Sequence, residues 1–189
     1  VFILLGAWSS ALFAADPFLA DKPNCIEFTP VEARFVRLAI PDSVQNQPCI
    51  DELEIYGPGN DENLALAATG AKASASSCLA GHVIHQTAHL NDGLYGNGHS
   101  WIAAGSRNEW VQIELPTVTP LAKVVFSRDR EGHYQDRLPA SVEIRVSPDG
   151  ANWKTVARRS AFPTLPAGEF SHVDLLRYAF ECEDLTWRR

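Results

Sequence analysis

The sequence predicts an all-β fold of the sandwich type. Three observations lead to this prediction. Apolar and polar residues alternate with a period of two in several short segments, as in strands with one buried face. Gly, Pro, Asn and Asp separate these segments at nearly regular intervals, and helical periodicity is scarce. Many short strands of this kind are typical of β-sandwiches.

Length and composition fit one moderate domain with additional segments. The chain has 189 residues, of which 46% are hydrophobic and 21% are charged, and its formal net charge is −7. An acidic chain without a basic stripe argues against nucleic acid as a partner, because phosphates require clustered Lys and Arg. Methionine is absent even at position 1, and the last residues are Trp187, Arg188 and Arg189. We therefore expect a fragment of a longer protein.

Residues 1–14 are apolar and end in small residues, which predicts a truncated secretory signal peptide over residues 1–15. A buried helix or strand is the alternative. The segment is too short to cross a bilayer, which needs roughly 20 apolar residues. We expect a secreted, periplasmic or cell-surface protein without a membrane span in its mature chain. Export would permit disulfides, and four cysteines allow three pairings, of which we expect Cys25 with Cys49 and leave Cys78 and Cys182 open.

Two strands are expected early in the chain. Residues 34–40 place Val36, Leu38 and Ile40 on one face, and residues 50–56 place Leu53 and Ile55 inward. A broad connection joins the two strands. Residues 57–60, Gly-Pro-Gly-Asn, then form a linker by composition.

The middle of the chain contains weaker segments at residues 63–67, 71–75 and 82–90. A turn at residues 91–93, Asn-Asp-Gly, opens a loop that ends at Trp101. Residues 110–115 then alternate cleanly, which predicts another strand with Val111, Ile113 and Leu115 on one side.

The strongest signal lies between residues 121 and 153. Residues 122–126 are a nearly continuous apolar run, and Val142, Ile144 and Val146 alternate with polar residues, so two strands of a hairpin are expected. Asp149 and Gly150 form the next turn, and a short strand follows to Val156. The loop at residues 127–139, between the two strands, is rich in charged and aromatic residues, so we expect binding there. Residues 161–189 are a tail or the start of a truncated region, in which residues 171–183 fit a helix or a strand.

Seven segments carry a family resemblance. NLALAATGAKASASS, LNDGLYGNGHSW, EWVQIELP, VVFSRDR and VEIRVSPDGANWKTV follow one another as in coagulation factor 5/8 type C (discoidin) domains. They are equally similar to the related family 32 carbohydrate-binding modules, which share a galactose-binding jelly-roll sandwich. ARFVRLAI and CIDELEIYG resemble the last two strands of the same family. The resemblance covers roughly residues 26–158 and implies an all-β jelly-roll β-sandwich.

The order of these segments departs from the family. The two strands that end a family domain come first here. One explanation is a remnant of a preceding domain followed by an incomplete copy. The other is circular permutation of one domain spanning residues 16–160, with residues 57–60 as the new connection. Permutation is favoured, because a lone two-stranded hairpin is marginal in water and a sandwich without two strands would expose its edges.

The resemblance implies a structural Ca²⁺. Its ligands would be the carboxylates of Asp92 and Glu52, with the main-chain carbonyls of His89 and Leu94 and with Asn97. Oxygen ligands in an irregular loop suit this hard cation. The alternative is that Asp92 only shapes a turn and that Glu52 is solvated.

The resemblance also implies a sugar site in loops at one end of the sandwich. Arg128 matches the position of an arginine that binds sugar hydroxyls in relatives. Polar and aromatic residues of neighbouring loops are expected to accompany it: His99, Trp101, Arg107, Asn108, Asp129, His133 and Tyr134. Planar polar groups bind adjacent hydroxyls, and an aromatic face covers the apolar side of a pyranose. The alternatives are that Arg128 only forms salt bridges within its loop and that Trp101 is a core residue.

No motif indicates catalysis. The sequence lacks a convincing Ser-His-Asp order, a Gly-rich phosphate loop and a carboxylate pair for glycoside cleavage. His82, His85 and His89 would lie on one face of a helix, so zinc is a minor alternative. We therefore expect a non-catalytic, monomeric module that binds a glycan or cell-surface carbohydrate and is attached to further domains. The alternatives are a protein-interaction or architectural module, and an accessory fragment of an enzyme whose catalytic domain lies downstream.

Overall fold

The structure is a computed structural model that describes residues 17–162. The predicted signal peptide at residues 1–15 and the segment at residues 171–183 lie outside the described residues. The described part consists of β-strands and two short 3₁₀ helices: β1 (Asn24–Ser43), β2 (Cys49–Ile50), β3 (Glu52–Tyr56), η1 (Ala67–Thr69), β4 (Lys72–Ala75), η2 (Thr87–Asn91), β5 (Trp101–Ile102), β6 (Arg107–Ser127), β7 (Pro139–Ser147) and β8 (Lys154–Ser160). The all-β prediction is confirmed.

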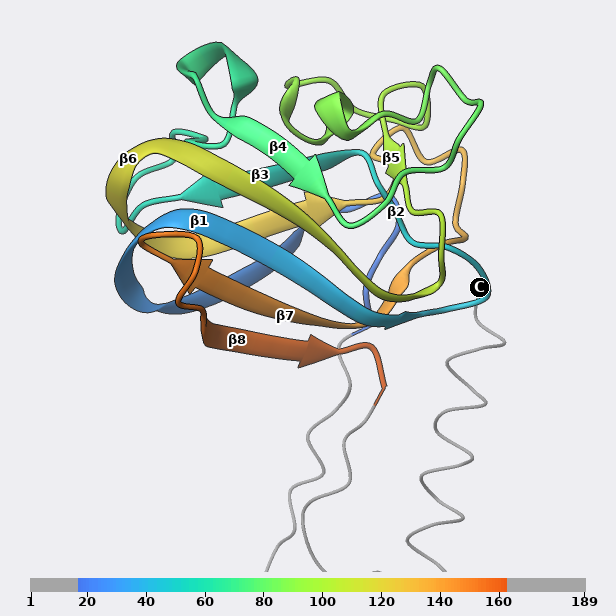
Figure 1. The fold of residues 1–189 in the computed structure, drawn as a ribbon. Coiled ribbons are helices and arrows are strands. Elements are labelled where there is room, and N and C mark those ends of the chain that lie inside the picture. Colours follow the sequence, from blue (N-terminus) through green and yellow to red (C-terminus); the bar gives the residue numbers. More distant parts are fainter. Residues whose placement is uncertain (1–16, 163–189) are drawn as a thin grey trace, which may run out of the picture.

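The strands form a jelly-roll β-sandwich in which neighbouring strands are antiparallel. The main sheet has the order β3-β6-β1-β7-β8, with β4 also paired to β6, and β2 pairs with β5. The long strands β1 and β6 curve strongly (Figure 1). The start of β6 pairs with β4 and the end of β1, whereas the end of β6 pairs with β3 and the start of β1. Along β6, the first and second halves therefore have different neighbours on the side away from β1.

The core follows the alternation that the sequence predicts. Leu38 in the central strand β1 lies opposite Val111 of β6 on one side and Ile144 of β7 on the other, and all three are buried. Leu53 and Ile55 of β3 are fully buried as well. Each such side chain removed from water stabilises the fold by about 1.5–3 kcal/mol. The alternating residues thus join the early and the late strands in one core.

The predicted hairpin at residues 121–153 is wrong in its pairing. β6 and β7 are not neighbours, because β1 lies between them and pairs with both. The segments at residues 110–115 and 122–126, predicted as separate strands, are parts of the single strand β6. The sheet accommodates Pro116 in a bulge, where the register shifts between Ala33 and Phe35. β1 likewise starts ten residues earlier than predicted, because a second bulge between Glu27 and Val31 accommodates Pro30.

The two early strands belong to the same sheet as the later ones. β1 is its central strand, and β3 is its edge strand beside β6. Circular permutation itself stays a prediction. In the part of the chain that is described, no helix is long and apolar enough to cross a membrane.

The predicted disulfide between Cys25 and Cys49 is wrong. Cys25, Cys49 and Cys78 are free thiols, and Cys182 lies outside the described residues. Cys25 lies exposed near the start of β1, opposite Val125, whereas Cys49 is buried in β2 opposite Ile102. The two thiols therefore belong to separate parts of the sandwich.

Candidate functional site

Three loops meet at one end of the sandwich. They are the β1–β2 connection, the segment between η2 and β5, and the β6–β7 loop, which lie together beside β2 and β5 (Figure 1). Main-chain hydrogen bonds tie the first and third loops, from Val44 N to Leu138 O at 2.8 Å and from Cys49 N to Arg137 O at 3.0 Å. The second loop is anchored by Gly96 N, which donates to Asp51 Oδ2 at 3.0 Å. The loops are thus preformed.

Arg128 is the centre of a polar network between these loops. Its Nε donates to the carbonyl of Asp136 at 3.0 Å, its Nη2 pairs with Asp136 Oδ1 at 2.7 Å, and its Nη1 donates to Asn97 Oδ1 at 3.0 Å. The side chain is 2% exposed. Arg128 was predicted to touch a sugar; in this structure it instead lies beneath the surface and fixes the loops.

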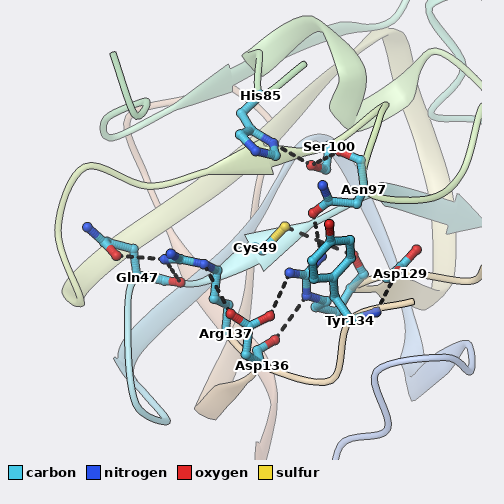
Figure 2. A network of polar contacts seen from close by, with 10 residues as sticks. Gln47, Cys49, His85, Asn97, Ser100, Asp129, Tyr134, Asp136 and Arg137 are labelled. Carbon is cyan, nitrogen blue, oxygen red and sulfur yellow. Dashed lines mark hydrogen bonds and ion pairs between the residues drawn. The ribbon is translucent and has the colours of Figure 1, made fainter. Parts of the chain in front are cut away.

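Tyr134, one of the predicted ligand-binding residues, is exposed and lies above this network. Its ring is over the Arg128 guanidinium, 5.2 Å from the centroid, and the residue is 48% exposed. Its main-chain N–H donates to Asp129 Oδ2 at 2.8 Å, and Asp129 is completely buried. Figure 2 shows Tyr134 among Asn97, Asp129 and Asp136. A buried arginine and a buried carboxylate thus position an exposed aromatic ring.

The other predicted residues lie at different depths. His133 is well exposed beside Glu131, 3.5 Å away. Arg107 starts β6 and pairs with Asp42 at 3.6 Å. Its neighbour Asn108 has a φ of 55°. Neither residue belongs to the polar network in Figure 2. The structure therefore brings Arg128, Asp129 and Tyr134 together and leaves Arg107 and Asn108 outside.

Trp101 is a core residue, which corrects its predicted role in ligand binding. It is completely buried in β5, and its indole N–H donates to the carbonyl of Ser77 at 2.7 Å. A ring without exposed surface offers no platform to a sugar. The alternative of a core tryptophan is the one the structure supports.

The sequence did not reveal a second polar cluster, which surrounds the buried Glu54 beside the loops. Arg130 Nη2 pairs with Glu54 Oε2 at 3.0 Å, and its guanidinium lies over the Tyr95 ring at 4.2 Å. Tyr95 donates its hydroxyl to Glu54 Oε1 at 2.7 Å, and burial, with this bond, raises the pKa of Tyr95 to about 12. Asp51 accepts from the main-chain N–H of Arg130 at 2.9 Å. The predicted strand at residues 50–56 places Leu53 and Ile55 inward and therefore Glu54 on its solvent-exposed face, so no signal in the sequence pointed to this cluster.

The residues predicted for Ca²⁺ partly converge. Glu52 is completely buried rather than solvated. Within residues 17–162 its Oε1 has no hydrogen-bond partner, while Oε2 accepts from Gly93 N at 3.4 Å. Burial, with the nearby charge of Asp92 among others, raises the pKa of Glu52 to about 9. A buried carboxyl with an unpartnered oxygen beside a second carboxylate fits a hard cation. Asn97, in contrast, accepts from Arg128 through its side chain.

The three histidines of the zinc alternative do not share a helix face. Residues 82–86 form a turn and an isolated bridge, and η2 starts only at Thr87. His85 is buried, with Nδ1 2.8 Å from Ser100 Oγ, and burial lowers its pKa. His89 instead comes close to Asp92 and His99.

His85 and Ser100 form a pair of residue types that can act in nucleophilic catalysis. Here the Ser100 hydroxyl donates to the carbonyl of Asn97 at 3.0 Å, and Ser100 is completely buried. A hydroxyl that is closed off from solvent and already donating cannot attack a substrate in this conformation. The pair therefore supports the loop.

The comparisons with known proteins agree with the fold. The family model of the F5/8 type C domain matches residues 72–174, from β4 to beyond β8 and over more than half of the chain. The search of curated proteins and the search of solved structures each return no match. Domains of this family are generally non-catalytic binding modules. With its antiparallel β-sandwich and this match, the chain belongs to the F5/8 type C (discoidin) domain family.

Proposed function

We propose that the chain is a non-catalytic glycan-binding module that recognises its ligand with the three loops around Arg128. Membership of the F5/8 type C family suggests carbohydrate or protein binding. The fold is compatible with both kinds of ligand, so the side chains at the loops distinguish between them.

The observation that carries the proposal is the position of Tyr134. One side of its ring faces the buried guanidinium of Arg128, yet the residue remains 48% exposed. Aromatic rings cover the apolar face of a pyranose, and a ring already fixed in place loses little entropy on binding. Asp129 and Arg128 hold Tyr134 from below. The ring is therefore a preorganised platform.

Polar groups suited to sugar hydroxyls surround the ring. The Asp136 carboxylate is 39% exposed although it pairs with Arg128. Arg137 is partly exposed and donates to Gln47 Oε1 at 2.6 Å. His133, next to Tyr134 in sequence, is exposed. Charged and amide groups of this kind bind hydroxyl groups, so specificity would come from a few such contacts around Tyr134.

A protein-interaction module is the second candidate. Val83, Ile84 and Leu94 are 85%, 42% and 48% exposed, and they lie in the segments before and after η2. Exposed apolar side chains that occur together are typical of surfaces that bind other proteins. A partner of this kind would contact Val83 and Ile84 rather than Tyr134.

A glycan array with the wild-type chain, Tyr134→Ala and Tyr134→Phe separates the two candidates. The proposal predicts binding to a group of related glycans, loss of that binding in Tyr134→Ala and retention in Tyr134→Phe, which keeps the ring. Val118→Ala is the control, because Val118 is exposed in the bend of β6. Absence of binding to every glycan, together with a protein partner lost in Val83→Ser, would favour the second candidate.

We further propose a structural Ca²⁺ held by Glu52 and Asp92 with the main-chain carbonyls of His89 and Leu94. The ion would neutralise the two neighbouring carboxylates and stabilise the loop that carries Asn97. This proposal is supported by the buried, unpartnered Oε1 of Glu52.

Export to the cell surface or the surroundings also remains a proposal, supported only by the apolar composition of residues 1–14. Such a location would suit a module that binds carbohydrates outside the cell. Attachment to further domains is proposed with it.

A further inference from the structure

His89, Asp92 and His99 place three metal-binding side chains together at the surface of the loop. Each offers one donor atom, and the three atoms lie within 4.8 Å of one another. His89 comes from η2, Asp92 follows η2 directly, and His99 precedes β5. The two imidazole rings are 5.2 Å apart, and His99 Nδ1 lies 3.1 Å from Asp92 Oδ2.

The hydrogen bonds of His89 determine which of its nitrogens is free. Nδ1 lies 3.1 Å from the carbonyl oxygen of Ile84 and 3.3 Å from that of Ser100. Both partners are acceptors, so Nδ1 carries the proton and Nε2 keeps its lone pair in the neutral ring. Metal-binding histidines characteristically donate their second ring N–H to such a carbonyl, which fixes the tautomer and the orientation of the ring.

The Asp92 and His99 side chains face each other in the same cluster. The Oδ1 atom of Asp92 accepts from Leu94 N at 2.9 Å, which orients the carboxylate and leaves Oδ2 toward His99. Because a carboxylate only accepts, this 3.1 Å contact is a hydrogen bond donated by His99 Nδ1, and a zinc ion bound between the two atoms would displace that proton. Neighbouring ligand atoms of a tetrahedral zinc site with bonds of about 2.1 Å lie about 3.4 Å apart, so Asp92 and His99 would need to move only slightly. The Asp92 and His99 side chains are 23% and 45% exposed, so an ion can reach them.

We propose that His89, Asp92 and His99 form a transition-metal site that takes Zn²⁺. Two imidazoles and one carboxylate suit zinc, whereas Ca²⁺ requires oxygen ligands. Three protein ligands leave a fourth position for water. The zinc site shares Asp92 with the proposed Ca²⁺ site, but its other ligands are imidazoles, whereas the Ca²⁺ site would use the buried Glu52 and main-chain carbonyls.

The test is calorimetric titration of the metal-free 189-residue chain with ZnCl₂. We expect one zinc ion per chain and at least a tenfold loss of affinity in His89→Ala and in His99→Ala. His82→Ala is the matched control, since His82 is exposed in the same segment but outside the donor set, and it should bind zinc as the wild type does. Glu52→Gln should also retain zinc.

Two further measurements keep the proposal open to contradiction if a variant does not fold. NMR of the wild-type imidazole nitrogens should show zinc-dependent shifts at His89 and His99 but not at His82. The absorption spectrum of the Co²⁺ form should lack a thiolate charge-transfer band, which excludes binding at free cysteines. Unchanged affinity in both His→Ala variants, an equal loss in His82→Ala, or a thiolate band would overturn the proposal.

Discussion

The ion pair between Arg128 and Asp136 is buried on one side only. Nη2 of Arg128 lies 2.7 Å from Oδ1 of Asp136, yet the arginine side chain is 2% exposed and the aspartate side chain 39%. Water can solvate the carboxylate but not the guanidinium. The arginine therefore depends on its protein partners, whereas Asp136 can also interact with a ligand.

Arg128→Ala should destabilise the chain by about 2–3 kcal/mol, because it removes a buried group together with its bonds to Asn97 and to Asp136. Because Asp136 is partly exposed, this cost lies below the roughly 3–5 kcal/mol of a broken, fully buried pair. Urea unfolding followed by circular dichroism measures the change.

Arg107→Ala is the control for that measurement. Arg107 pairs with Asp42 at 3.6 Å, but its side chain is 75% exposed. Exposed pairs contribute about 0–1 kcal/mol, so a change within about 0.5 kcal/mol is expected. Equal losses of stability in the Arg107 and Arg128 variants would contradict the structural role assigned to Arg128.

Glu52 should make the stability of the calcium-free chain depend on pH. Burial raises its pKa in the folded chain to about 9, from an ordinary value of 4.5. Between these values the folded state binds more protons than the unfolded state, so stability falls as pH rises from about 4.5 to about 9. Urea unfolding in EDTA at pH 5 and pH 8 should show this fall, and Glu52→Gln should reduce it. If the free energy of unfolding of the wild-type chain instead rises between pH 5 and pH 8 as much as that of Glu52→Gln, then Glu52 ionises freely in the folded chain.

Added Ca²⁺ should raise the melting temperature of the wild-type chain at pH 8, because binding only the folded state stabilises it. Asp92→Asn and Glu52→Gln should each abolish most of this increase. Differential scanning calorimetry with CaCl₂ or EDTA gives the values. A melting temperature that is the same in both solutions would argue against the site.

The sequence allowed the fold class and the core to be predicted because buried strands have a short, strict period. Val36, Leu38 and Ile40 alternate with polar residues, and the structure buries all three. The resemblance to the discoidin family, carried by segments such as EWVQIELP, is confirmed by the family match. Pairing partners could not be predicted in the same way. β1 lies between β6 and β7 although it comes long before both, and local patterns contain no information on such neighbours.

The depth of the site residues was equally hard to predict. Arg128 and Trp101 were expected to face a ligand, but Arg128 is buried and paired with Asp136, and Trp101 is buried against Ser77. Glu52 was predicted as a Ca²⁺ ligand with solvation as the alternative, and the structure buries it, with Gly93 of the loop after η2 donating to its carboxylate. Burial of polar residues depends on which loops fold over a strand, and this follows from the tertiary structure rather than from residue type.

Cys49 should be unreactive in the folded chain. It is completely buried, and burial raises the pKa of its thiol to about 11, so little thiolate exists at neutral pH. Brief treatment with iodoacetamide, followed by peptide mass spectrometry, should label Cys25 but modify Cys49 only after unfolding. Recovery of a peptide pair joined through Cys25 and Cys49 would contradict the free thiols of the structure.

We propose that the chain is a circularly permuted family domain. The family match begins at Lys72, so it leaves out β1, β2 and β3, although β1 is the central strand between β6 and β7. A chain starting at residue 58 should therefore lose cooperative unfolding, because β6 and β7 would both have open edges. Calorimetry compares it with the full chain. Undiminished cooperative unfolding of the shorter chain would defeat the proposal.

A single variant in β1 tests the same relationship without truncation. Leu38→Ala should cost about 2–5 kcal/mol, because Leu38 is completely buried between Val111 and Ile144. Val118→Ala, at an exposed position of β6, should cost less than about 0.5 kcal/mol. A small effect of Leu38→Ala on urea unfolding would mean that β1 does not stabilise the later strands.

The most direct test of glycan binding at the three loops is an NMR titration of the ¹⁵N-labelled chain with the glycan that binds most strongly on the array. If the three loops bind the glycan, amide shifts should concentrate at residues 45–47, 94–99 and 128–138, and Tyr134→Ala should abolish them. Shifts confined to the sheet face around Arg37, whose guanidinium lies between Trp110 and Trp153, would contradict it.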